Sequence, residues 1–231
     1  MTASAILVFS RMDSKRLPGK AFLDIGERPM LGRVLDRLRR VRPQQRIVVA
    51  TSQRSVDDPI ADFAGSERVE LFRGDCDDVA GRALACCDKL QLDFFVRISG
   101  DSPFIPPELV ERAIGMMADQ DADIVTNVFP RSWPAGTSVE AIKTDVLRRA
   151  HPQMNAQERE DVSPFFYAHT EDWRMVNIPA PDKRYKDVRL TVDTPEELER
   201  ARSICDRLGQ PAELATLDEV VGLSFEAAGA A

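Results

Sequence analysis

The chain has 231 residues, of which 43% are hydrophobic and 30% charged, and its net charge is −7. This composition argues against a disordered or fibrous chain, and the length suits one α/β domain. The negative charge argues against general nucleic-acid binding, which depends on lysines and arginines that neutralise phosphates. No apolar run approaches the roughly 20 residues that span a bilayer, and no signal-peptide pattern opens the sequence. We therefore expect a cytoplasmic protein without membrane contact.

Short β-branched or aromatic runs alternate with amphipathic helical patterns, which indicates a mostly parallel sheet covered by helices. In chain order, strands are predicted at residues 5–9, 46–50, 69–72, 94–98, 124–126, 139–142, 173–178 and 189–192. Helices are predicted near residues 31–41, from residue 58, and at 77–90, 108–117, 158–167 and 195–208. We expect a single domain over residues 1–225 and a frayed tail over 226–231.

The first predicted helix carries several arginines on its polar face and at its exit. They are Arg33, Arg37, Arg39, Arg40 and Arg42. Such a row is usually a solvated face, so we expect these side chains to meet water.

A basic loop, SRMDSKRLPGK, follows the first predicted strand over residues 10–20. Its four cations are Arg11, Lys15, Arg16 and Lys20. Pro18 and Gly19 force a turn, so backbone N–H groups can face inward beside these cations, which suits a triphosphate. Neither the Rossmann nor the Walker glycine spacing occurs, and on composition alone a solvated loop is an equally good interpretation.

Two aspartates follow predicted strands at their carboxyl ends, where open α/β sheets bind ligands. Asp101 comes after residues 94–98 and a Ser-Gly pair. Asp193 comes after residues 189–192, and Thr194 and Glu197 form a helix capping box that leaves Asp193 free. Carboxylates that converge from separate strand ends can hold a hard cation that also binds phosphate oxygens, as magnesium does.

The basic loop closely resembles the opening signature of the cytidylyltransferase family, which includes CMP-sugar synthetases for acylneuraminate and ketodeoxyoctulosonate and a spore-coat polysaccharide branch. Further similar motifs follow in the family's order: VVATS at 48–52, FRGDCDDVAGR at 72–82, RISGDSP at 97–103, EREDVSPF at 158–165 and RLTVDTPEEL at 189–198. The similarity covers nearly the whole chain. It implies a three-layer, Rossmann-like nucleotidyltransferase α/β fold with a mostly parallel mixed central sheet, and a homodimer.

The resemblance also implies a reaction, in which CMP passes from CTP to an acidic sugar, pyrophosphate leaves and Mg²⁺ is the cofactor. The residues that it marks as catalytic are Arg11, Lys20, Asp101 and Asp193, with both aspartates as magnesium ligands. The implied nucleotide-binding residues are Ser10, Arg11, Arg16, Lys20, Ala50, Thr51, Arg73 and Gly100. Among them, the resemblance places Ala50, Thr51 and Arg73 near the cytosine ring. The implied sugar-binding residues are Arg131, Glu140 and Arg159, and either arginine can pair with a sugar carboxylate.

Four residues depart from the family's pattern. Phe9 stands in place of the usual glutamine, and Asp13 replaces a small residue inside the basic loop. Ala135 and Ser138 alter the sugar-side segment RSWPAGTSVE. A negative Asp13 would repel a nucleotide unless it pairs with a cation such as Lys15 or Arg16. The identity of the acceptor sugar stays open for this reason.

Two other functions remain open from the sequence. The strings Asp75-Cys76-Asp77 and Asp121-Ala122-Asp123 resemble the DxD metal motif of glycosyltransferases, a weak signal because three-residue matches are common. Alternatively, the chain is a non-catalytic relative that binds a nucleotide or sugar without turnover. Pyrophosphate release from CTP separates these functions.

Overall fold

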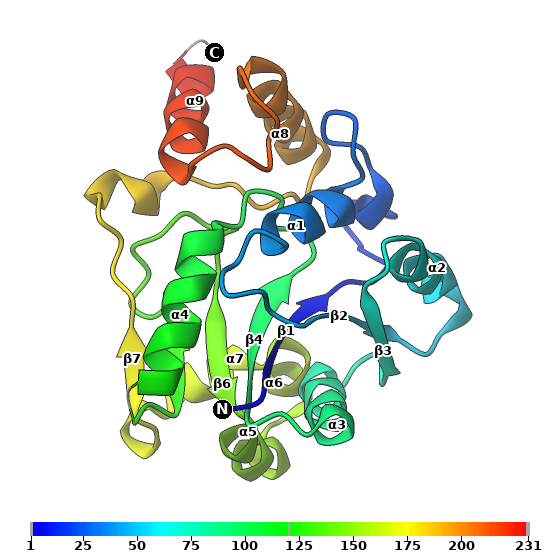
Figure 1. The fold of residues 1–231 in the computed structure, drawn as a ribbon, viewed down its shortest axis with the longest axis vertical. Coiled ribbons are helices and arrows are strands. Elements are labelled where there is room, and N and C mark those ends of the chain that lie inside the picture. Colours follow the sequence, from blue (N-terminus) through cyan, green and yellow to red (C-terminus); the bar gives the residue numbers. More distant parts are fainter. Residues whose placement is uncertain (1, 120, 230–231) are drawn as a thin grey trace.

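The computed structural model describes residues 2–119 and 121–229. At its centre is a seven-stranded sheet in the order β3-β2-β1-β4-β6-β5-β7 (Figure 1). The strands are β1 Ser4–Phe9, β2 Ile47–Ser52, β3 Glu70–Gly74, β4 Phe94–Ser99, β5 Ile124–Thr126, β6 Glu140–Lys143 and β7 Met175–Asn177. Strands β1 to β4 run parallel, β6 is antiparallel to both of its neighbours, and β7 is parallel to β5. The predicted mixed, mostly parallel sheet is confirmed.

Helices cover both faces of this sheet, which makes the fold three-layered as predicted (Figure 1). One face carries α1 Met30–Leu38, α2 Asp58–Ser66, α4 Pro107–Asp119, α8 Pro195–Arg207 and α9 Leu217–Gly229. The other carries α3 Val79–Leu90, α5 Thr144–Ala150, α6 Ala156–Asp161 and α7 Ser163–Ala168.

Strand β1 shows why this arrangement follows from the sequence. Successive side chains of a strand point to opposite faces, so Ile6 and Val8 join the core under α1 and α4. Ala5 and Leu7 join the core under α3 and α5. Full burial of an aliphatic side chain contributes about 1.5–3 kcal/mol, so a strand that is apolar on both faces is most stable in the middle of the sheet.

The strand predicted at residues 189–192 is not part of the sheet. Its only β-type pairing in the described chain is an isolated bridge between Arg189 and Ala135. Leu190 N–H donates to Ala135 O at 2.6 Å, whereas Val192 N–H donates to Asp101 O at 3.2 Å. Because the segment bonds first to one loop and then to another, no continuous ladder forms, although Leu190 and Val192 are buried as an apolar pattern requires.

The single helix predicted at 158–167 is two helices. Helices α6 and α7 meet at Val162, whose φ of 67° is in the region that β-branched residues rarely adopt. Proline at position 164 begins a new helix, since it lacks the N–H that would continue the old one. Helices α5 and α9 were not predicted. The expected frayed tail overlaps α9 over 226–229, and residues 230–231 lie outside the described residues.

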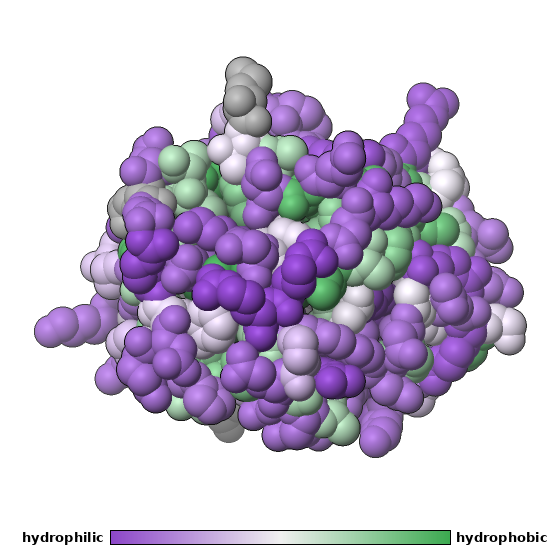
Figure 2. All heavy atoms as spheres, turned by 90° about the horizontal axis from the view of Figure 1, so that it is seen from below, coloured by the Kyte–Doolittle hydropathy of each residue, from purple (hydrophilic) through white to green (hydrophobic). Residues whose placement is uncertain are grey.

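Hydrophilic residues cover most of the face shown in Figure 2, with hydrophobic ones interspersed. The large hydrophobic side chains that are exposed in the described chain come from separate elements: Val56, Leu71, Phe129, Leu214 and Phe225. No helix within residues 2–119 and 121–229 combines the length and the apolar character that crossing a membrane requires.

Candidate active site

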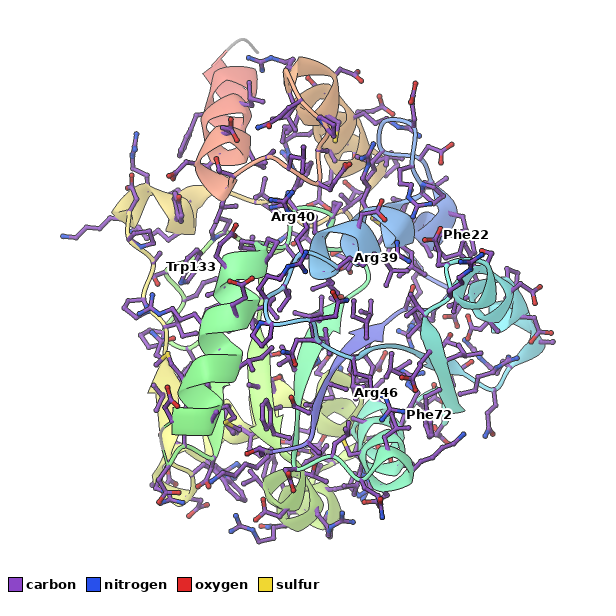
Figure 3. All side chains as sticks on the ribbon, in the orientation of Figure 1. Phe22, Arg39, Arg40, Arg46, Phe72 and Trp133 are labelled. Atoms are coloured by element: carbon purple, nitrogen blue, oxygen red, sulfur yellow. The ribbon has the colours of Figure 1, made fainter. Side chains whose placement is uncertain are left out.

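The basic loop that follows β1 closes on itself. Gly19 has a φ of 69°, a left-handed conformation that favours glycine, and its N–H donates to Met12 O at 3.0 Å. A short 3-10 helix, η1 Lys20–Phe22, comes next, and the Phe22 ring packs edge-on against Phe63 of α2 at 5.4 Å (Figure 3). This packing fixes the end of the loop, so that Lys20 projects toward the carboxyl edge of the sheet.

Two neighbouring strands hold the start of the loop. The Met12 N–H donates to Asp57 Oδ1 at 2.7 Å, and the fully buried Asp57 also accepts a hydrogen bond from Ser52 at the end of β2. On the other side, Gly100 N–H donates to Phe9 O at 2.8 Å. A Cβ on Gly100 would lie 2.9 Å from Ser10 Cβ, so glycine is required for this close approach.

A cluster of opposite charges lies at the carboxyl end of β4. Lys20 Nζ is 2.6 Å from Asp101 Oδ2 and 2.7 Å from Asp193 Oδ1. The second oxygen of Asp193 is 2.7 Å from an Arg16 nitrogen. The structure thus brings together four residues that the sequence marked as catalytic or nucleotide-binding, from three separate parts of the chain.

Lys20 and Asp101 are both charged. Burial lowers the pKa of Lys20, but the carboxylates of Asp101 and Asp193 together outweigh this effect and the pKa lies above its ordinary value. Burial likewise raises the pKa of Asp101, but Lys20 outweighs it and the pKa lies below its ordinary value. Both groups are therefore ionised at neutral pH.

The backbone around Asp193 frees its side chain, as predicted from the capping box. Thr194 caps α8 by accepting from Glu197 N–H, and the Glu197 carboxylate accepts from the backbone N–H of Asp193 at 2.7 Å. Because Thr194 and Glu197 satisfy the helix terminus, the Asp193 carboxylate points to Lys20 and Arg16 instead.

A cavity of about 530 Å³ opens at this edge of the sheet. The predicted site residues that line it are Ser10, Arg11, Arg16, Lys20, Gly100, Asp101 and Asp193. Its walls are the basic loop, the ends of β1 and β4, the first turns of α3 and helix α6. The volume is that of a typical small-molecule site.

Asp13 is neutralised within the loop, but not by the partners that we expected. Its carboxylate is 2.6 Å from an Arg54 nitrogen and 3.5 Å from Arg11 Nε. Arg11 also donates to Glu160 Oε1 of α6 at 2.8 Å. The hydrogen bond from Arg54 helps to keep the pKa of Asp13 below its ordinary value against the opposing effect of burial.

The residues expected near the nucleotide base do not line the cavity. Ala50 and Thr51 of β2 are fully buried. All three nitrogens of the Arg73 guanidinium are engaged: two donate to the backbone oxygens of Ser52 and Arg54, at 2.9 and 2.8 Å, and the third lies 2.7 Å from Asp58. Arg73 therefore holds the ends of β2 and β3 together in this structure.

The three expected sugar-binding residues also lie outside the cavity lining. Arg131 donates to Pro134 O at 3.4 Å and to Ser138 Oγ at 3.2 Å. Arg159 of α6 donates to a backbone carbonyl at 3.2 Å.

Glu140 is buried in the sheet beside the cavity. It lies 2.7 Å from an Arg97 nitrogen and accepts a hydrogen bond from Tyr167. Burial and this carboxylate raise the pKa of Tyr167. Arg97 itself lines the cavity, so Glu140 contacts the cavity wall indirectly, through its ion pair with Arg97.

Apart from Ser99 and residues of the basic loop, sequence reasoning missed five polar residues that line the cavity: Arg82, Arg97, Gln157, Glu160 and Asp161. Four of them stand within motifs quoted above, Arg82 as the last residue of FRGDCDDVAGR. Their presence in those motifs was the available signal. Neither periodicity nor spacing shows which motif positions face a ligand.

The two DxD-like strings are occupied by local contacts. Asp75 accepts from the backbone N–H groups of Asp77 and Asp78, both at 2.8 Å, and Asp78 caps α3. Asp123 accepts from the Arg174 backbone N–H at 3.0 Å. Neither string lines the cavity.

The sheet order and the helix layers define a Rossmann-like nucleotidyltransferase fold, which a solved cytidylyltransferase shares. The chain matches the cytidylyltransferase family over residues 5–218, and it belongs to that family.

Individual relatives agree with this assignment. A spore coat polysaccharide biosynthesis protein of Bacillus subtilis is 26% identical over 211 residues, 88% of this chain and 87% of the relative. A 3-deoxy-manno-octulosonate cytidylyltransferase of Hahella chejuensis is 37% identical over 130 residues, 54% of this chain and 50% of the relative. The solved structure of a cytidylyltransferase from Leptospira borgpetersenii superimposes with a TM-score of 0.92 at 27% identity, covering 99% of this chain and 96% of that one.

Proposed function

We propose that this protein transfers CMP from CTP to an acidic sugar and releases pyrophosphate. The observation that carries the proposal is the convergence of Asp101, Asp193 and Lys20 at the carboxyl edge of the sheet, inside a cavity bounded by the basic loop. The family assignment supports a cytidine nucleotide as the donor. The Hahella relative supports an acidic acceptor, because its name specifies 3-deoxy-manno-octulosonate, a sugar acid.

The basic loop supplies the cations that a triphosphate needs. Arg11, Arg16 and Lys20 line one cavity, and each is now paired with a carboxylate. Phosphate oxygens can replace these carboxylates as hydrogen-bond acceptors, and arginine binds them in a bidentate manner. We assign the three side chains to the phosphates of CTP.

The carboxylate pair fits magnesium. An oxygen of Asp101 and an oxygen of Asp193 both lie within 2.7 Å of one cationic atom, the Lys20 ammonium. Hard carboxylate oxygens are the ligands that Mg²⁺ takes, usually one or two of them together with phosphate oxygens and water. When bound, Mg²⁺ would neutralise charge on the phosphates. Asp101 and Asp193 would hold it.

The chain's own residues then have defined tasks in the transfer. A hydroxyl oxygen of the acceptor forms a bond to the α-phosphorus while the bond from that phosphorus to the bridging oxygen of pyrophosphate breaks, and the hydroxyl proton passes to water. Lys20 and Arg16 stabilise the charge that develops on the phosphates, and Arg11 orients them. The displacement needs no covalent intermediate with the protein.

The acceptor would enter from the side of α6. Gln157, Glu160 and Asp161 of this helix line the cavity, and Arg159 is on the same helix. We assign Arg159 and Arg131 to the sugar carboxylate as part of the proposal, because an arginine fork matches a carboxylate. Both side chains would have to leave their present partners to reach it.

A pyrophosphate-release screen tests the proposed function. CTP, UTP, ATP and GTP are each incubated with magnesium and a panel of acidic and neutral sugars. We expect release with CTP and an acidic sugar only. Binding of CTP without release with any sugar would favour a non-catalytic relative, and equal release with all four nucleotides would contradict the proposal.

A further inference from the structure

Arg82 of α3 is a buried cation in which two of the three guanidinium nitrogens, Nε and Nη1, have no hydrogen-bond partner within the described part of the chain. The residue is 3% exposed. It nevertheless lines the cavity. The other cations considered above, Arg11, Arg16 and Lys20, each lie within 2.8 Å of a carboxylate oxygen.

This burial destabilises the ligand-free protein. A buried charge whose N–H donors lack acceptors destabilises a folded protein. Burial accordingly lowers the pKa of Arg82. The Phe9 ring lies beneath the guanidinium at 5.6 Å from its Cζ atom, but this cation–π contact supplies no oxygen acceptor for the buried N–H donors. An apolar side chain would be more stable at this position, so the guanidinium is better explained by a ligand.

The position of Arg82 indicates which part of a ligand it meets. Its stem packs on Gly74, where an added Cβ would lie 2.8 Å from Arg82 Cγ. Gly74 directly follows Arg73 at the end of β3, and Phe9 ends β1. Arg82 is thus on the β3-β2-β1 half of the sheet, which also carries the residues that the family resemblance places near the cytosine ring. Arg73, the arginine expected there, has all its nitrogens engaged elsewhere.

We propose that Arg82, rather than Arg73, recognises the cytosine ring by donating hydrogen bonds to its O2 and N3 edge. The inference rests on the proposed function and names the residue that would select the base. Phe9 would hold the guanidinium plane in place, which gives this departure from the family pattern a role.

The chemistry of the two pyrimidines makes this contact selective. A guanidinium carries only donors. Cytosine presents two adjacent acceptors, O2 and N3, whereas uracil carries a hydrogen on N3 and would direct a donor against a donor. A site built to hydrogen-bond one partner discriminates strongly against an analogue that leaves its polar groups unpaired.

The test is equilibrium binding of CTP, UTP and inorganic tripolyphosphate to the wild type and to Arg82→Gln and Arg82→Lys. We expect both substitutions to weaken CTP binding by about 10- to 100-fold, as bidentate base contacts do. UTP and tripolyphosphate binding should change less than about threefold, so the preference for CTP is lost. Equal weakening of all three probes would mean that Arg82 binds phosphate and would overturn the inference.

Two matched arginine variants and a stability measurement exclude a structural effect. Arg148→Gln removes an exposed arginine of α5 and should leave all three affinities unchanged. Arg73→Gln should lower the melting temperature, because it breaks contacts between strand ends. The ratio of CTP affinity to UTP affinity should stay unchanged. Arg82→Gln should not lower the melting temperature of the ligand-free protein. The inference would be overturned if the Arg73 variant lost the preference for CTP over UTP while both Arg82 variants kept it.

The wild-type result separates this inference from the proposed function. A wild type that binds neither CTP nor UTP contradicts the proposed function itself. A wild type that prefers CTP, with an unchanged preference in Arg82→Gln and Arg82→Lys, contradicts only the role of Arg82.

Discussion

Lys20 and Asp101 are 81 positions apart in the chain, yet the lysine ammonium lies 2.6 Å from a carboxylate oxygen of Asp101. The same ammonium also contacts Asp193. In the proposed function, Mg²⁺ would bind the same two carboxylates that Lys20 now contacts. Lys20 and the metal would then compete for them, and the lysine would become free to bind phosphate when the metal takes the carboxylates.

This competition can be measured without turnover. We expect Lys20→Met to bind Mn²⁺ about tenfold or more tightly than the wild type in the absence of nucleotide, because the substitution removes a competing cation. Titration followed by electron paramagnetic resonance reports free Mn²⁺ directly. Lys15→Met is the control, since Lys15 is an exposed cation of the same loop. Unchanged Mn²⁺ affinity in Lys20→Met would show that the metal does not use these carboxylates.

The aspartates themselves should be essential for turnover. Asp101→Asn and Asp193→Asn are nearly isosteric, so we expect folded proteins whose turnover falls by roughly a hundredfold or more. Raising the magnesium concentration should restore part of the activity, because weakened metal affinity is one cause of the loss. The measurement is turnover against magnesium concentration, with circular dichroism as the check of folding. A folded variant with full activity would exclude that aspartate as an essential ligand.

A second ionic cluster ties α1 to α2 and gives a pH-dependent prediction. Glu67 accepts two hydrogen bonds from Arg28 at 2.7 Å and one at 3.0 Å from Arg39, which is labelled in Figure 3. The bond from Arg28 is the main reason that the pKa of Glu67 lies below its ordinary value of 4.5. We expect Glu67→Gln to lower the free energy of unfolding at neutral pH by about 2 kcal/mol.

The sign of the pH effect follows from the lowered pKa. The folded state favours the ionised form of Glu67, so its contribution is complete above pH 4.5 and is lost as the pH falls through the folded pKa. Urea unfolding at several pH values should show that the difference in the free energy of unfolding between the wild type and Glu67→Gln becomes smaller below the folded-state pKa of Glu67. Glu70→Gln breaks the exposed pair with Arg46 and should cost less than about 1 kcal/mol. If the difference in the free energy of unfolding between the wild type and Glu67→Gln grew on acidification, ionised Glu67 would not be the stabilising form.

Arg37 gives a prediction about stability alone. It is 1% exposed, and its guanidinium donates to the backbone oxygens of Ile105, Ala212 and Ala215 at 2.6, 2.8 and 3.1 Å. Arg37→Ala would leave these buried carbonyls without donors, so we expect the free energy of unfolding to fall by about 3–5 kcal/mol. Arg40→Ala, at the same end of α1, should cost less than about 1 kcal/mol. Chemical denaturation of both variants measures these changes in the free energy of unfolding. Equal decreases in the two variants would contradict a stabilising role of the buried Arg37 hydrogen bonds.

Arg37 also shows where sequence reasoning fails. The helical pattern placed it on a polar face, and the expectation that it meets water was wrong. Its acceptors come from loops 68 to 178 residues further along the chain, and no local pattern encodes such contacts. The strand predicted at 189–192 was wrong for a related reason, since its pairing depends on loops elsewhere in the chain.

The parts that could be predicted depend on local chemistry. Alternating burial of β1 follows from its apolar residues, and the capping box at Thr194 follows from residue types at fixed spacing. The basic loop and Asp101 were found because whole motifs mark strand ends, whereas Asp193 was found in a motif whose preceding segment does not join the sheet. The base and sugar contacts transferred from the family resemblance, such as Arg73 and Glu140, are engaged in protein contacts in this structure. Resemblance identifies a motif, but the packing around each side chain decides what it meets.

The measurement that tests cytidylyl transfer most directly is the fate of the α-phosphorus of CTP. CTP labelled with ³²P at that position is incubated with magnesium, an acidic sugar and either the wild type or Asp101→Asn. The account predicts that the wild type moves the label into a sugar–CMP product in equal amount to the pyrophosphate released, and that the variant forms this product at least about a hundredfold more slowly. Label that remains in CTP with every acidic sugar tested, or that appears only as free CMP, would contradict it.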